Sequence, residues 1–483
     1  MIDTQAIRNK VLNLAMRGQL TEQLPEDGTA EELYDQITKE KARLVNEKKI
    51  KKTKSIGDVP NDDTPFELPE NWKWVYFGEI FSHNTGKALN SSNKEGNLLE
   101  YITTSNMYWD HFELDNLKKM YFKDEEIEKC TIRKGDLLIC EGGDIGRSAI
   151  WPFSYEMRIQ NHIHKLRPYL STLLPVFYYY VMRLYKSINM ISGQGIGLQG
   201  FSSKRVHSLV VPLPPVAEQT RIVEKIEAIF EILDKIDALQ EQYVLNQEAL
   251  KSKLIDAAIQ GQLTEQLPED GTAEELYRHI QEKKKALIKS KRFKKDKTKL
   301  EVNKEDVLFD IPSNWKWVCW GEIVNIVSAR RVHQSDWRKE GIPFYRAREI
   351  AKLADEGFVD NDLYISEELY DEFSKSGVPS EGDLMVSAVG TLGKTYVVKE
   401  SDHFYYKDAS VLCFENYAAV DPYYLRYVMN SDAMKKQIES NSGGTTVDTL
   451  TMIRMIKYVL PLPPLAEQHR IVEKLDALLS LVE

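Results

Sequence analysis

A long run of regularly spaced apolar residues stands in the middle of the chain. After the proline-rich segment 212–215, isoleucine and leucine recur at intervals of four and three residues, at Ile222, Ile226, Ile229, Leu233 and Ile236. This spacing is typical of a coiled-coil seam. The same frame continues through Gln240, Tyr243, Gln247, Leu250, Leu254 and Ala257. The pattern predicts one helix of about 40 residues, roughly 60 Å long, which is too long for the core of a compact domain and is typical of a spacer.

Segments on both sides of this helix occur twice. Residues 18–34 and 261–277 both read GQLTEQLPEDGTAEELY. The blocks 212–225 and 461–474 share the pattern PLPP-x-AEQ-x-RIVEK, and Trp-Lys-Trp-Val stands at 72–75 and again at 315–318. Solenoid repeats have periods of only about 20–50 residues, far shorter than the distance between these copies. The sequence therefore indicates two copies of a whole domain, each with its own helical spacer.

The second spacer is interrupted by the chain ends. Its first part runs from Ile471 to Glu483, and its last part lies at the N-terminus. There Ile7, Val11 and Leu14 match Leu250, Leu254 and Ala257 of the central helix. Residues 235–243 of the central helix have no counterpart. We expect the two terminal helices to lie end to end beside the central one in a long antiparallel coiled coil with circular pseudo-two-fold symmetry. The alternative is a tandem duplication without this pairing.

The repeats divide the chain into seven segments. We assign 1–45 to the N-terminal part of the distal spacer and its repeat block, 46–64 to a basic linker, 65–211 to a first globular domain, 212–288 to the central spacer and repeat block, 289–307 to a second basic linker, 308–460 to a second globular domain and 461–483 to the C-terminal part of the distal spacer. Short strands, turn residues and one or two helices in each globular domain predict a mixed α/β (α+β) fold with much antiparallel pairing.

Composition narrows the class of protein. No apolar run approaches the ~18 residues of a membrane span, and the N-terminus MIDTQAIRNK lacks the apolar stretch of a signal peptide. The 4 cysteines are scattered without a CxxC pair. We therefore expect a cytoplasmic protein without a zinc site.

Charge is distributed unevenly. The net charge is −10, but residues 38–54 carry eight basic and two acidic side chains, and residues 282–299 carry ten basic and two acidic. Both stretches occupy the same place in their repeats. They are either solvated linkers or contacts to nucleic-acid phosphates, which give salt-dependent affinity without sequence preference.

Motifs for catalysis are incomplete. Residues 421–424 read Asp-Pro-Tyr-Tyr, which lacks the second proline of the Asn/Asp-Pro-Pro-Tyr/Phe motif of adenine methyltransferases, and no glycine-rich cofactor loop follows a strand. The GxxG turns at 143–146 and 390–393 precede Arg147 and Lys394. Such a turn either cradles a phosphate or forms a hairpin that needs positive φ. We expect no catalysis and no bound cofactor.

Polar and basic residues that differ between the two domains are the candidates for reading DNA, because arginine pairs with guanine edges and asparagine or glutamine with adenine. In the first domain they are Asn84, Lys87, Asn90, Asn93, Arg147, Arg158, Gln160, Asn161, His162 and Gln194. In the second they are Arg330, Arg331, His333, Gln334, Arg338, Arg346, Arg348, Lys394, Lys407, Thr445 and Thr446. The alternative is that most are ordinary surface residues.

Two differing domains held on repeated helical spacers resemble the specificity subunit of type I restriction–modification systems. The doubled PLPP-x-AEQ-x-RIVEK and LTEQLPEDGTAEELY blocks and the GDLL and GDLM turns at 135–138 and 382–385 carry the resemblance over essentially the whole chain. It implies that residues 65–211 and 308–460 are target-recognition domains, each reading one half of a bipartite DNA site. The spacers would set the gap between the halves.

The resemblance also implies partners. The spacers would dock two modification subunits, which bind S-adenosylmethionine and methylate adenine, and ATP-using restriction subunits would join the complex. Seven seam positions are the expected partner contacts: Ile222, Ile226, Ile229, Leu233, Ile471, Leu475 and Leu478. The chain itself would carry no cofactor. The competing interpretation is a coiled-coil adaptor with two protein-binding domains.

Overall fold

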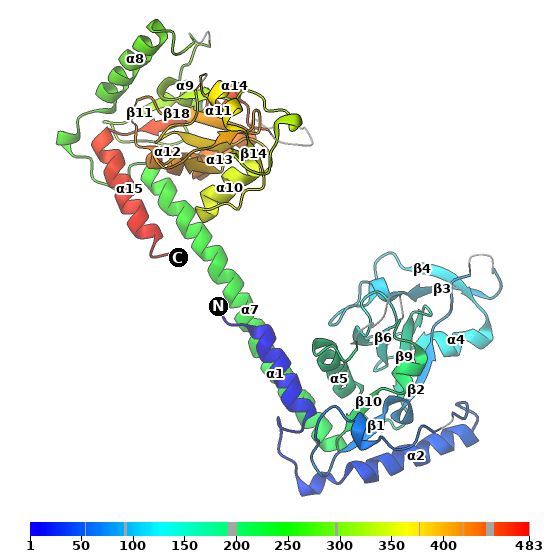
Figure 1. The fold of residues 1–483 in the computed structure, drawn as a ribbon. Coiled ribbons are helices and arrows are strands. Elements are labelled where there is room, and N and C mark those ends of the chain that lie inside the picture. Colours follow the sequence, from blue (N-terminus) through cyan, green and yellow to red (C-terminus); the bar gives the residue numbers. More distant parts are fainter. Residues whose placement is uncertain are drawn as a thin grey trace. The chain divides into compact units, whose positions relative to one another are not determined.

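The computed structural model describes residues 1–482 except 54, 91–93, 192–199, 295–297, 376, 419 and 441–448. The chain forms two compact units, Met1–Glu241 and Gln242–Glu483 (Figure 1). Helix α7 (Val216–Ile259) belongs partly to each unit, so the predicted central spacer is a single helix of 44 residues. No helix in the described part of the chain is long and apolar enough to cross a membrane.

The first unit is a mixed α/β fold built on three sheets. Strand β1 (Lys73–Tyr76) pairs antiparallel with β10 (Val210–Leu213). A four-stranded antiparallel sheet has the order β2 (Phe81–Thr85), β9 (Ile163–Pro168), β6 (Leu137–Cys140), β7 (Ser148–Ile150). Another has the order β4 (Lys118–Phe122), β3 (Asn97–Ile102), β8 (Met157–Ile159), β5 (Thr131–Ile132), with β3 and β8 parallel. The helices are α1 (Thr4–Met16), α2 (Ala30–Asn46), α3 (Phe77–Ile80), α4 (Asp124–Cys130), α5 (Pro175–Ser187), α6 (Ser203–His207) and the short η1 (Pro25–Asp27), η2 (Asn61–Asp63) and η3 (Thr104–Asn106).

The second unit repeats this plan with changes. Strand β11 (Lys316–Cys319) pairs with β19 (Val459–Leu462). The larger sheet has the order β12 (Asn325–Val327), β18 (Val411–Glu415), β15 (Leu384–Ser387), β16 (Thr395–Val397), and the smaller one β14 (Tyr364–Ile365), β13 (Ile342–Tyr345), β17 (Tyr405–Tyr406). The helices are α8 (Ala273–Lys289), α9 (Trp320–Ile323), α10 (Ala347–Glu356), α11 (Glu367–Ser374), α12 (Pro422–Asn430), α13 (Asp432–Ser440), α14 (Met452–Met455), α15 (Leu465–Leu479) and the short η4 (Pro268–Asp270), η5 (Lys304–Asp306) and η6 (Gln334–Asp336).

The strand after each GDL turn separates two apolar cores. In β6, Leu137 and Ile139 pack with the helices of the unit, whereas Leu138 and Cys140 pack on the other face with Trp151. In β15, Leu384 faces the helices in the same way. Both faces of these strands are buried, which explains why their sequences are continuous apolar runs.

The repeated blocks form the same buried polar contact in each unit, which we call the Trp–Glu clamp. In the first unit, the buried Glu218 at the start of α7 accepts hydrogen bonds from Trp72 Nε1 at 2.8 Å and Gln23 Nε2 at 2.7 Å. In the second unit, Glu467 accepts from Trp315 Nε1 at 2.8 Å, and Gln266 takes the place of Gln23. The clamp ties the repeat block, the first strand of the domain and its spacer helix together.

An ion pair beside each clamp adds to it. Arg221 on α7 contacts Asp27 in the first unit, and Arg470 on α15 contacts Asp270 in the second. The hydrogen bond and charge of Arg221 lower the pKa of Asp27, and Arg470 does the same for Asp270. The sequence identity of the blocks is therefore explained by a shared structural contact.

Each unit also contains a pair of spacer helices. In the first unit α1 lies beside the N-terminal part of α7, where Arg8 contacts Asp234 and Asp237 (Figure 1). In the second unit Gln247 of α7 donates to the backbone oxygen of Val482 at 2.6 Å. The seam residue Tyr243, by contrast, is 59% exposed. Packing on the predicted seam is thus seen toward the two ends of α7, while a continuous coiled coil and the end-to-end placement of the terminal helices stay predictions.

Candidate nucleic-acid interface

Several of the predicted DNA-reading side chains lie together in one loop of the second unit. We call this loop, residues 328–341 between β12 and β13, the η6 loop. Five of the predicted residues lie in it: Arg330, Arg331, His333, Gln334 and Arg338. All five are exposed. Arg331 makes no ion pair with the described residues. A loop that exposes arginine and glutamine together offers donors for guanine and both donor and acceptor for adenine.

Local contacts hold this loop in shape. The backbone N–H of His333 donates to the Asp336 carboxylate at 3.0 Å, which closes the short η6 turn. Val332 is buried, and the backbone of Arg338 exchanges two hydrogen bonds with Tyr364 at the edge of β14. The guanidinium of Arg330 lies 4.2 Å from the ring centre of Phe373. The loop is therefore pre-organised, which lowers the entropy cost of binding.

Two other predicted arginines are held by acidic partners. Arg346 and Arg348 both contact the carboxylate of Glu349 at 2.8 Å, and Asp362 accepts from both as well. Burial alone would raise the pKa of Glu349, but the hydrogen bonds from the two arginines lower it to about 2. These arginines are oriented and charge-compensated, which suits a positioning role beside the η6 loop.

The remaining candidates of the second unit are less prominent. Lys394 is paired with Asp355, and Lys407 is half-buried with its backbone N–H bonded to Tyr345. Thr445 and Thr446 lie outside the described residues. Gly390 and Gly393 of the GxxG turn have φ of 78° and 77° and join the antiparallel strands β15 and β16. Positive φ at both glycines, between two antiparallel strands, is the geometry of a β-hairpin turn, which was the alternative to a phosphate-binding turn.

In the first unit, the structure brings two predicted groups together. The turn 160–162 between β8 and β9 lies beside Lys87, because Gln160 bridges to Lys87 and the N–H of Asn161 donates to its carbonyl at 3.0 Å. His162 is exposed and its Nδ1 is 3.5 Å from the Glu141 carboxylate. Lys87 itself is ion-paired with Glu126 and mostly buried. The turn therefore presents its side chains while Lys87 supports it.

Other first-unit candidates are scattered. Asn84 lies on β2 opposite Lys165 and is half-buried, and Asn90 is exposed. Asn93 and Gln194 lie outside the described residues.

Arg147 follows the GxxG turn and faces the protein. Its Nη2 donates to the carbonyl of Thr104 at 2.6 Å, and its guanidinium lies 5.2 Å from the ring centre of Tyr108. Tyr108 in turn stacks on the exposed His111, with ring centres 4.6 Å apart and planes at 1°. Sequence reasoning missed this stack, although the run Tyr108-Trp109-Asp110-His111 is a visible aromatic cluster. Exposed stacked rings can contact sugars and bases.

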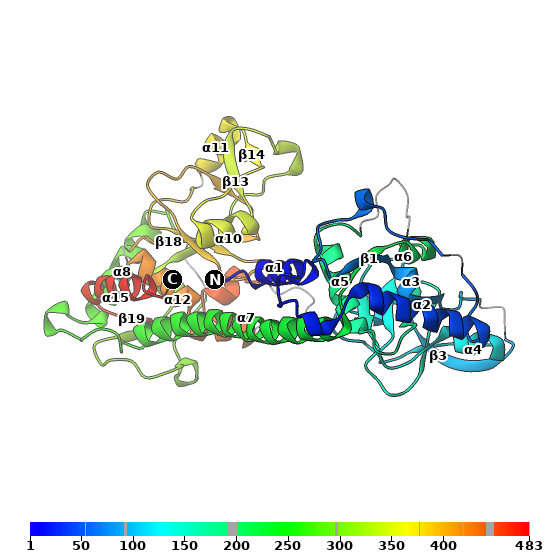
Figure 2. The same cartoon turned by 90° about the horizontal axis from the view of Figure 1, so that it is seen from below.

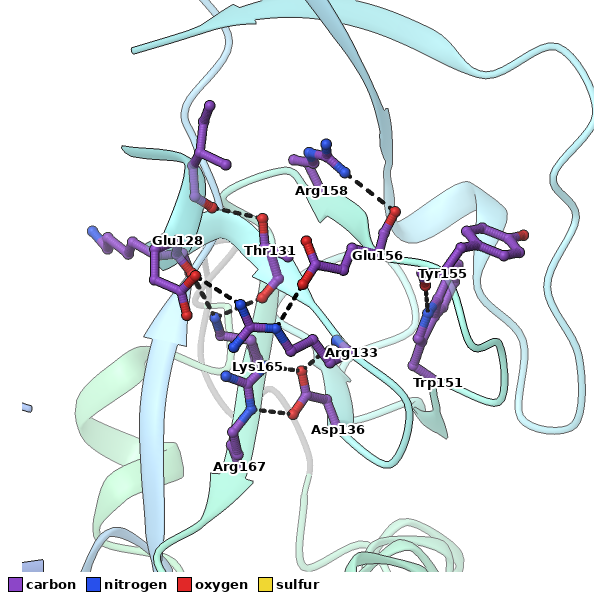
Figure 3. A network of polar contacts seen from close by, with 12 residues as sticks. Glu128, Thr131, Arg133, Asp136, Trp151, Tyr155, Glu156, Arg158, Lys165 and Arg167 are labelled. Atoms are coloured by element: carbon purple, nitrogen blue, oxygen red, sulfur yellow. Dashed lines mark hydrogen bonds and ion pairs between the residues drawn. The ribbon is translucent and has the colours of Figure 1, made fainter. Parts of the chain in front are cut away.

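Arg158 belongs to a polar network around β5, β8 and β9 (Figure 3). Its Nη1 donates to the carbonyl of Glu156 at 3.2 Å, while its Nε is buried without a hydrogen-bond partner among the described residues. Arg133, which sequence reasoning did not select, is held between Glu128 and Glu156 at 2.8 Å each (Figure 3). The network places two arginine side chains around Glu156, immediately before β8, with Arg133 on its carboxylate and Arg158 on its backbone carbonyl.

Two buried charged residues, Lys165 and Asp136, belong to the same network. Lys165 donates to the carbonyls of Lys129 and Thr131 at 2.9 and 2.8 Å, and burial lowers its pKa to about 8. Arg167 donates two hydrogen bonds of 2.7 Å to the carboxylate of Asp136 (Figure 3). Buried charges are tolerated here because each is hydrogen-bonded.

A buried histidine pair was also missed by sequence reasoning. The Nε2 of His164 is 2.7 Å from the carbonyl of Phe201, so that nitrogen carries a proton and its Nδ1 accepts from His83 Nε2 at 2.9 Å. Burial, with the charges of His164 and His207, lowers the pKa of His83 to about 3. The pair links β2, β9 and the segment at Phe201 in their neutral forms.

Cysteines and other candidate metal or catalytic residues have local structural surroundings. The described residues contain no group of three histidine, cysteine, aspartate or glutamate side chains that could hold a metal ion. The four cysteines are free and buried, and burial raises the pKa of Cys140 to about 11. The Asp421-Pro422 motif begins α12, where the Asp421 carboxylate caps the helix by accepting from the N–H groups of Tyr423 and Tyr424.

Comparisons with known proteins agree with this geometry. A family model described as "Type I restriction modification DNA specificity domain" matches residues 69–247 and 312–483. The EcoAI specificity subunit of Escherichia coli is 25% identical over 98% of this chain and 88% of its own length. The EcoEI specificity subunit of the same species is 27% identical over 66% of this chain and 61% of its own length. A chain in a solved structure of a type I R-M system has a TM-score of 0.57 at 18% identity, covering 86% of this chain and 92% of that one, so the fold is shared.

Proposed function

Because this chain belongs to the family of type I restriction modification DNA specificity domains, we propose that it selects the DNA sequence on which a modification and restriction complex acts. Specificity subunits of this family recognise DNA and leave catalysis to other subunits. The chain is therefore a recognition protein and not an enzyme, and S-adenosylmethionine and ATP are used by its partners.

The target is a bipartite, asymmetric DNA sequence. The observation that carries this proposal is that two matched frames hold different side chains: the Trp–Glu clamp is the same in both units, while the η6 loop of the second unit and the turn 160–162 of the first differ. Identical frames with unlike reading loops fit two different half-sites. An adaptor for proteins would not require this pattern.

In the second half-site the η6 loop reads base edges. Arg331, His333 and Gln334 are its exposed side chains, and Arg346 and Arg348 are held by Glu349. In the first unit the corresponding contacts come from Gln160, Asn161 and His162. Arg158 and the Tyr108–His111 stack add phosphate and sugar contacts.

The spacer helices set the gap between the half-sites and dock two modification subunits. Ile222, Ile226, Leu233, Ile471 and Leu475, which the seam pattern predicts as partner contacts, are buried inside their own units, and Ile229 and Leu478 are half-buried. These seam residues therefore hold the spacer helices in place and do not themselves contact the modification subunits. Tyr243, Val244, Leu245 and Leu250 of α7 are exposed and apolar, so we assign the direct contact to them.

Methylation mapping tests the proposal. The chain is expressed with its modification subunit in a host without adenine methylation, and methyladenine is mapped by long-read sequencing. We expect a split, asymmetric motif that depends on this chain. With Arg331→Ala and Gln334→Ala, one half of the motif should relax and the other should stay. A stable complex that methylates nothing, or a motif in which both halves change, would contradict the proposal.

A further inference from the structure

The two copies of the repeat diverge in charge immediately after their identical block. Residues 18–34 and 261–277 are the same, but residues 35–47 carry three basic and three acidic side chains, whereas residues 278–290 carry five basic and one acidic. The net charge of the two 13-residue stretches is therefore 0 and +4. Both stretches form the greater part of equivalent helices, α2 and α8.

The inner sides of these helices are alike. Ile37 of α2 and Ile280 of α8 are both fully buried. The side chains of Lys41 and Lys284 both reach the backbone carbonyl of the glycine that follows the first strand of the domain, Gly78 or Gly321. The helices α2 and α8 therefore dock on their units in the same way, and α2 lies beside α3 (Figure 2). The difference in charge is not a difference in fold.

The outer sides are not alike. On α2, Arg43 forms ion pairs with Glu40 at 2.6 Å and Glu47 at 2.8 Å. The residues of α8 at these positions are Ala286, Lys283 and Ser290. Where α2 has internal charge compensation, α8 has gained cations and lost the carboxylates.

The cations of α8 are exposed. Arg278, Lys283, Lys285 and Lys289 all lie at the surface, and the described residues place no carboxylate within ion-pair distance of them. Arg278, Lys285 and Lys289 are spaced by seven and four residues, so they share one face of the helix. The exposed Glu282 lies on the same face, four residues after Arg278, so this face carries three cations and one carboxylate. A net positive charge on one face raises the local potential and attracts a polyanion.

The segment that follows α8 keeps further cations close to the unit. Lys291 takes a left-handed conformation with φ of 63°, and the next turn buries Phe293, whose ring packs at 5.2 Å on Tyr417. Exposed Lys291, Arg292 and Lys294 flank a buried anchor and extend the basic surface of α8. Exposed Lys48, Lys49 and Lys51 stand at the matching positions after α2, so the difference in charge between the two units lies in residues 278–290. We call residues 278–294 the α8 basic face.

We propose that the α8 basic face binds the phosphate backbone of DNA next to the second half-site, and that α2 makes no equivalent contact. This inference rests on the proposed function and adds to it an asymmetry: sequence-independent affinity is concentrated on the second unit. The occupant is DNA because lysine ammonium groups on one helical face match regularly spaced phosphates, with no apolar patch among them of the kind a protein partner requires.

The sharpest test exchanges residues 278–290 for the sequence of residues 35–47, which lowers the net charge of this stretch from +4 to 0. The exchanged helix should fold, because its key inner residues, Ile280, Lys284 and Leu287, are the same as Ile37, Lys41 and Leu44 of α2. The matched control is the double variant Lys39→Glu and Lys51→Glu, in α2 and just after it. It lowers the net charge of the first unit by the same amount, four.

Both variants and the unchanged chain are assembled with modification subunits, and their affinities for a labelled duplex containing the mapped site and for one of random sequence are measured from low to moderate salt. Each phosphate contact contributes about 0.9 to the slope of log K against log salt. We expect the exchange in α8 to make the slope shallower by about 2 to 4 on both duplexes, with the methylation motif unchanged. The control in α2 should change the slope by less than about 1.

The outcomes are separable. Equal slopes for the exchanged and unchanged complexes would overturn the α8 contact, and equal changes in both variants would show that total charge matters and not α8. Loss of the modification subunits from the exchanged complex would identify the surface as a protein interface instead. If the unchanged complex bound both duplexes equally and methylated no motif, the proposed function itself would fail, irrespective of α8.

Discussion

Glu218 offers a direct test of why the repeat blocks are duplicated. Its carboxylate is fully buried and accepts from Trp72 Nε1 and Gln23 Nε2. Glu218→Ala removes both acceptors and leaves the buried Trp72 Nε1 without this partner, whereas Gln23 Nε2 still donates to the carbonyl of Gly18. A buried donor that loses its partner costs about 1–3 kcal/mol. The free energy of unfolding of the first unit should therefore fall by about 1–3 kcal/mol, which is a substantial part of the about 5–15 kcal/mol typical of a folded domain.

The assay must resolve the two units, because a chain of two units need not unfold in one step. Hydrogen exchange read by mass spectrometry reports the opening of each unit through its own peptides. We expect faster exchange in β1, β10 and the start of α7, with peptides of β11 and β19 unchanged. Glu467→Ala is the matched variant and should give the reverse pattern, since Glu467 holds Trp315 in the same way.

A compensating change separates the hydrogen-bond argument from simple loss of packing. Adding Trp72→Phe to Glu218→Ala removes the main orphaned donor, so the double variant should be less destabilised than the sum of the two single variants. The reasoning is refuted if the double variant shows a fully additive loss, or if Glu218→Ala accelerates exchange equally in both units.

Three further outcomes follow from the two units. Arg331→Ala and Gln334→Ala should each weaken specific binding by about 1–3 kcal/mol and relax the second half-site alone, read by methylation mapping; relaxation of the first half-site would contradict the placement of the η6 loop. Glu349→Gln should lower the unfolding free energy of the second unit by about 1–3 kcal/mol, because two arginines lose a charged partner, and an unchanged unfolding midpoint would refute it. Burial holds the pKa of His83 near 3, below its ordinary 6.5, so the unfolded chain binds the proton more readily and the first unit should lose about 2 kcal/mol as pH falls from 6.5 to 5. His83→Phe should flatten this pH dependence of unfolding, and a variant that keeps the full slope would show that other groups cause it.

The spacer and the repeat were predictable from sequence because they depend on local and periodic information. The spacing from Ile222 to Ile236 predicts a helix, and the structure has α7 across it. The identical blocks predicted equal structures, and the Trp–Glu clamp is the physical reason. The seam prediction is less complete, because Tyr243 and Leu250 are exposed although the frame includes them. Periodicity indicates which face of a helix is apolar but not whether a partner covers it.

The candidate site was predictable only in part, because exposure and pairing depend on tertiary contacts. Arg331 and Lys87 are equally plausible DNA contacts from the sequence, yet Arg331 is exposed and Lys87 is mostly buried against Glu126. The stack of Tyr108 on His111 was missed because their contact depends on the conformation of one loop. Charge and residue type select candidates, whereas ion pairs decide which of them present a side chain.

The clamp and the reading loops together explain how one frame can hold two specificities. In the second unit the clamp joins the start of β11 to the spacer helix α15 through Trp315 and Glu467, and the η6 loop follows β12, which belongs to another sheet of the same unit. The loop is stabilised by its own contacts, such as the bond from His333 to Asp336, and not by the clamp. Substitutions in the loop should therefore leave the contribution of the clamp to stability unchanged, because distant sites without shared partners act independently. The same separation permits α8 to gain cations while α2 stays neutral, since the docking residues Ile37 and Ile280 are unaffected. A duplicated chain of this kind can change what it reads and how strongly it holds DNA independently, provided that the buried carboxylates of the two clamps stay in place.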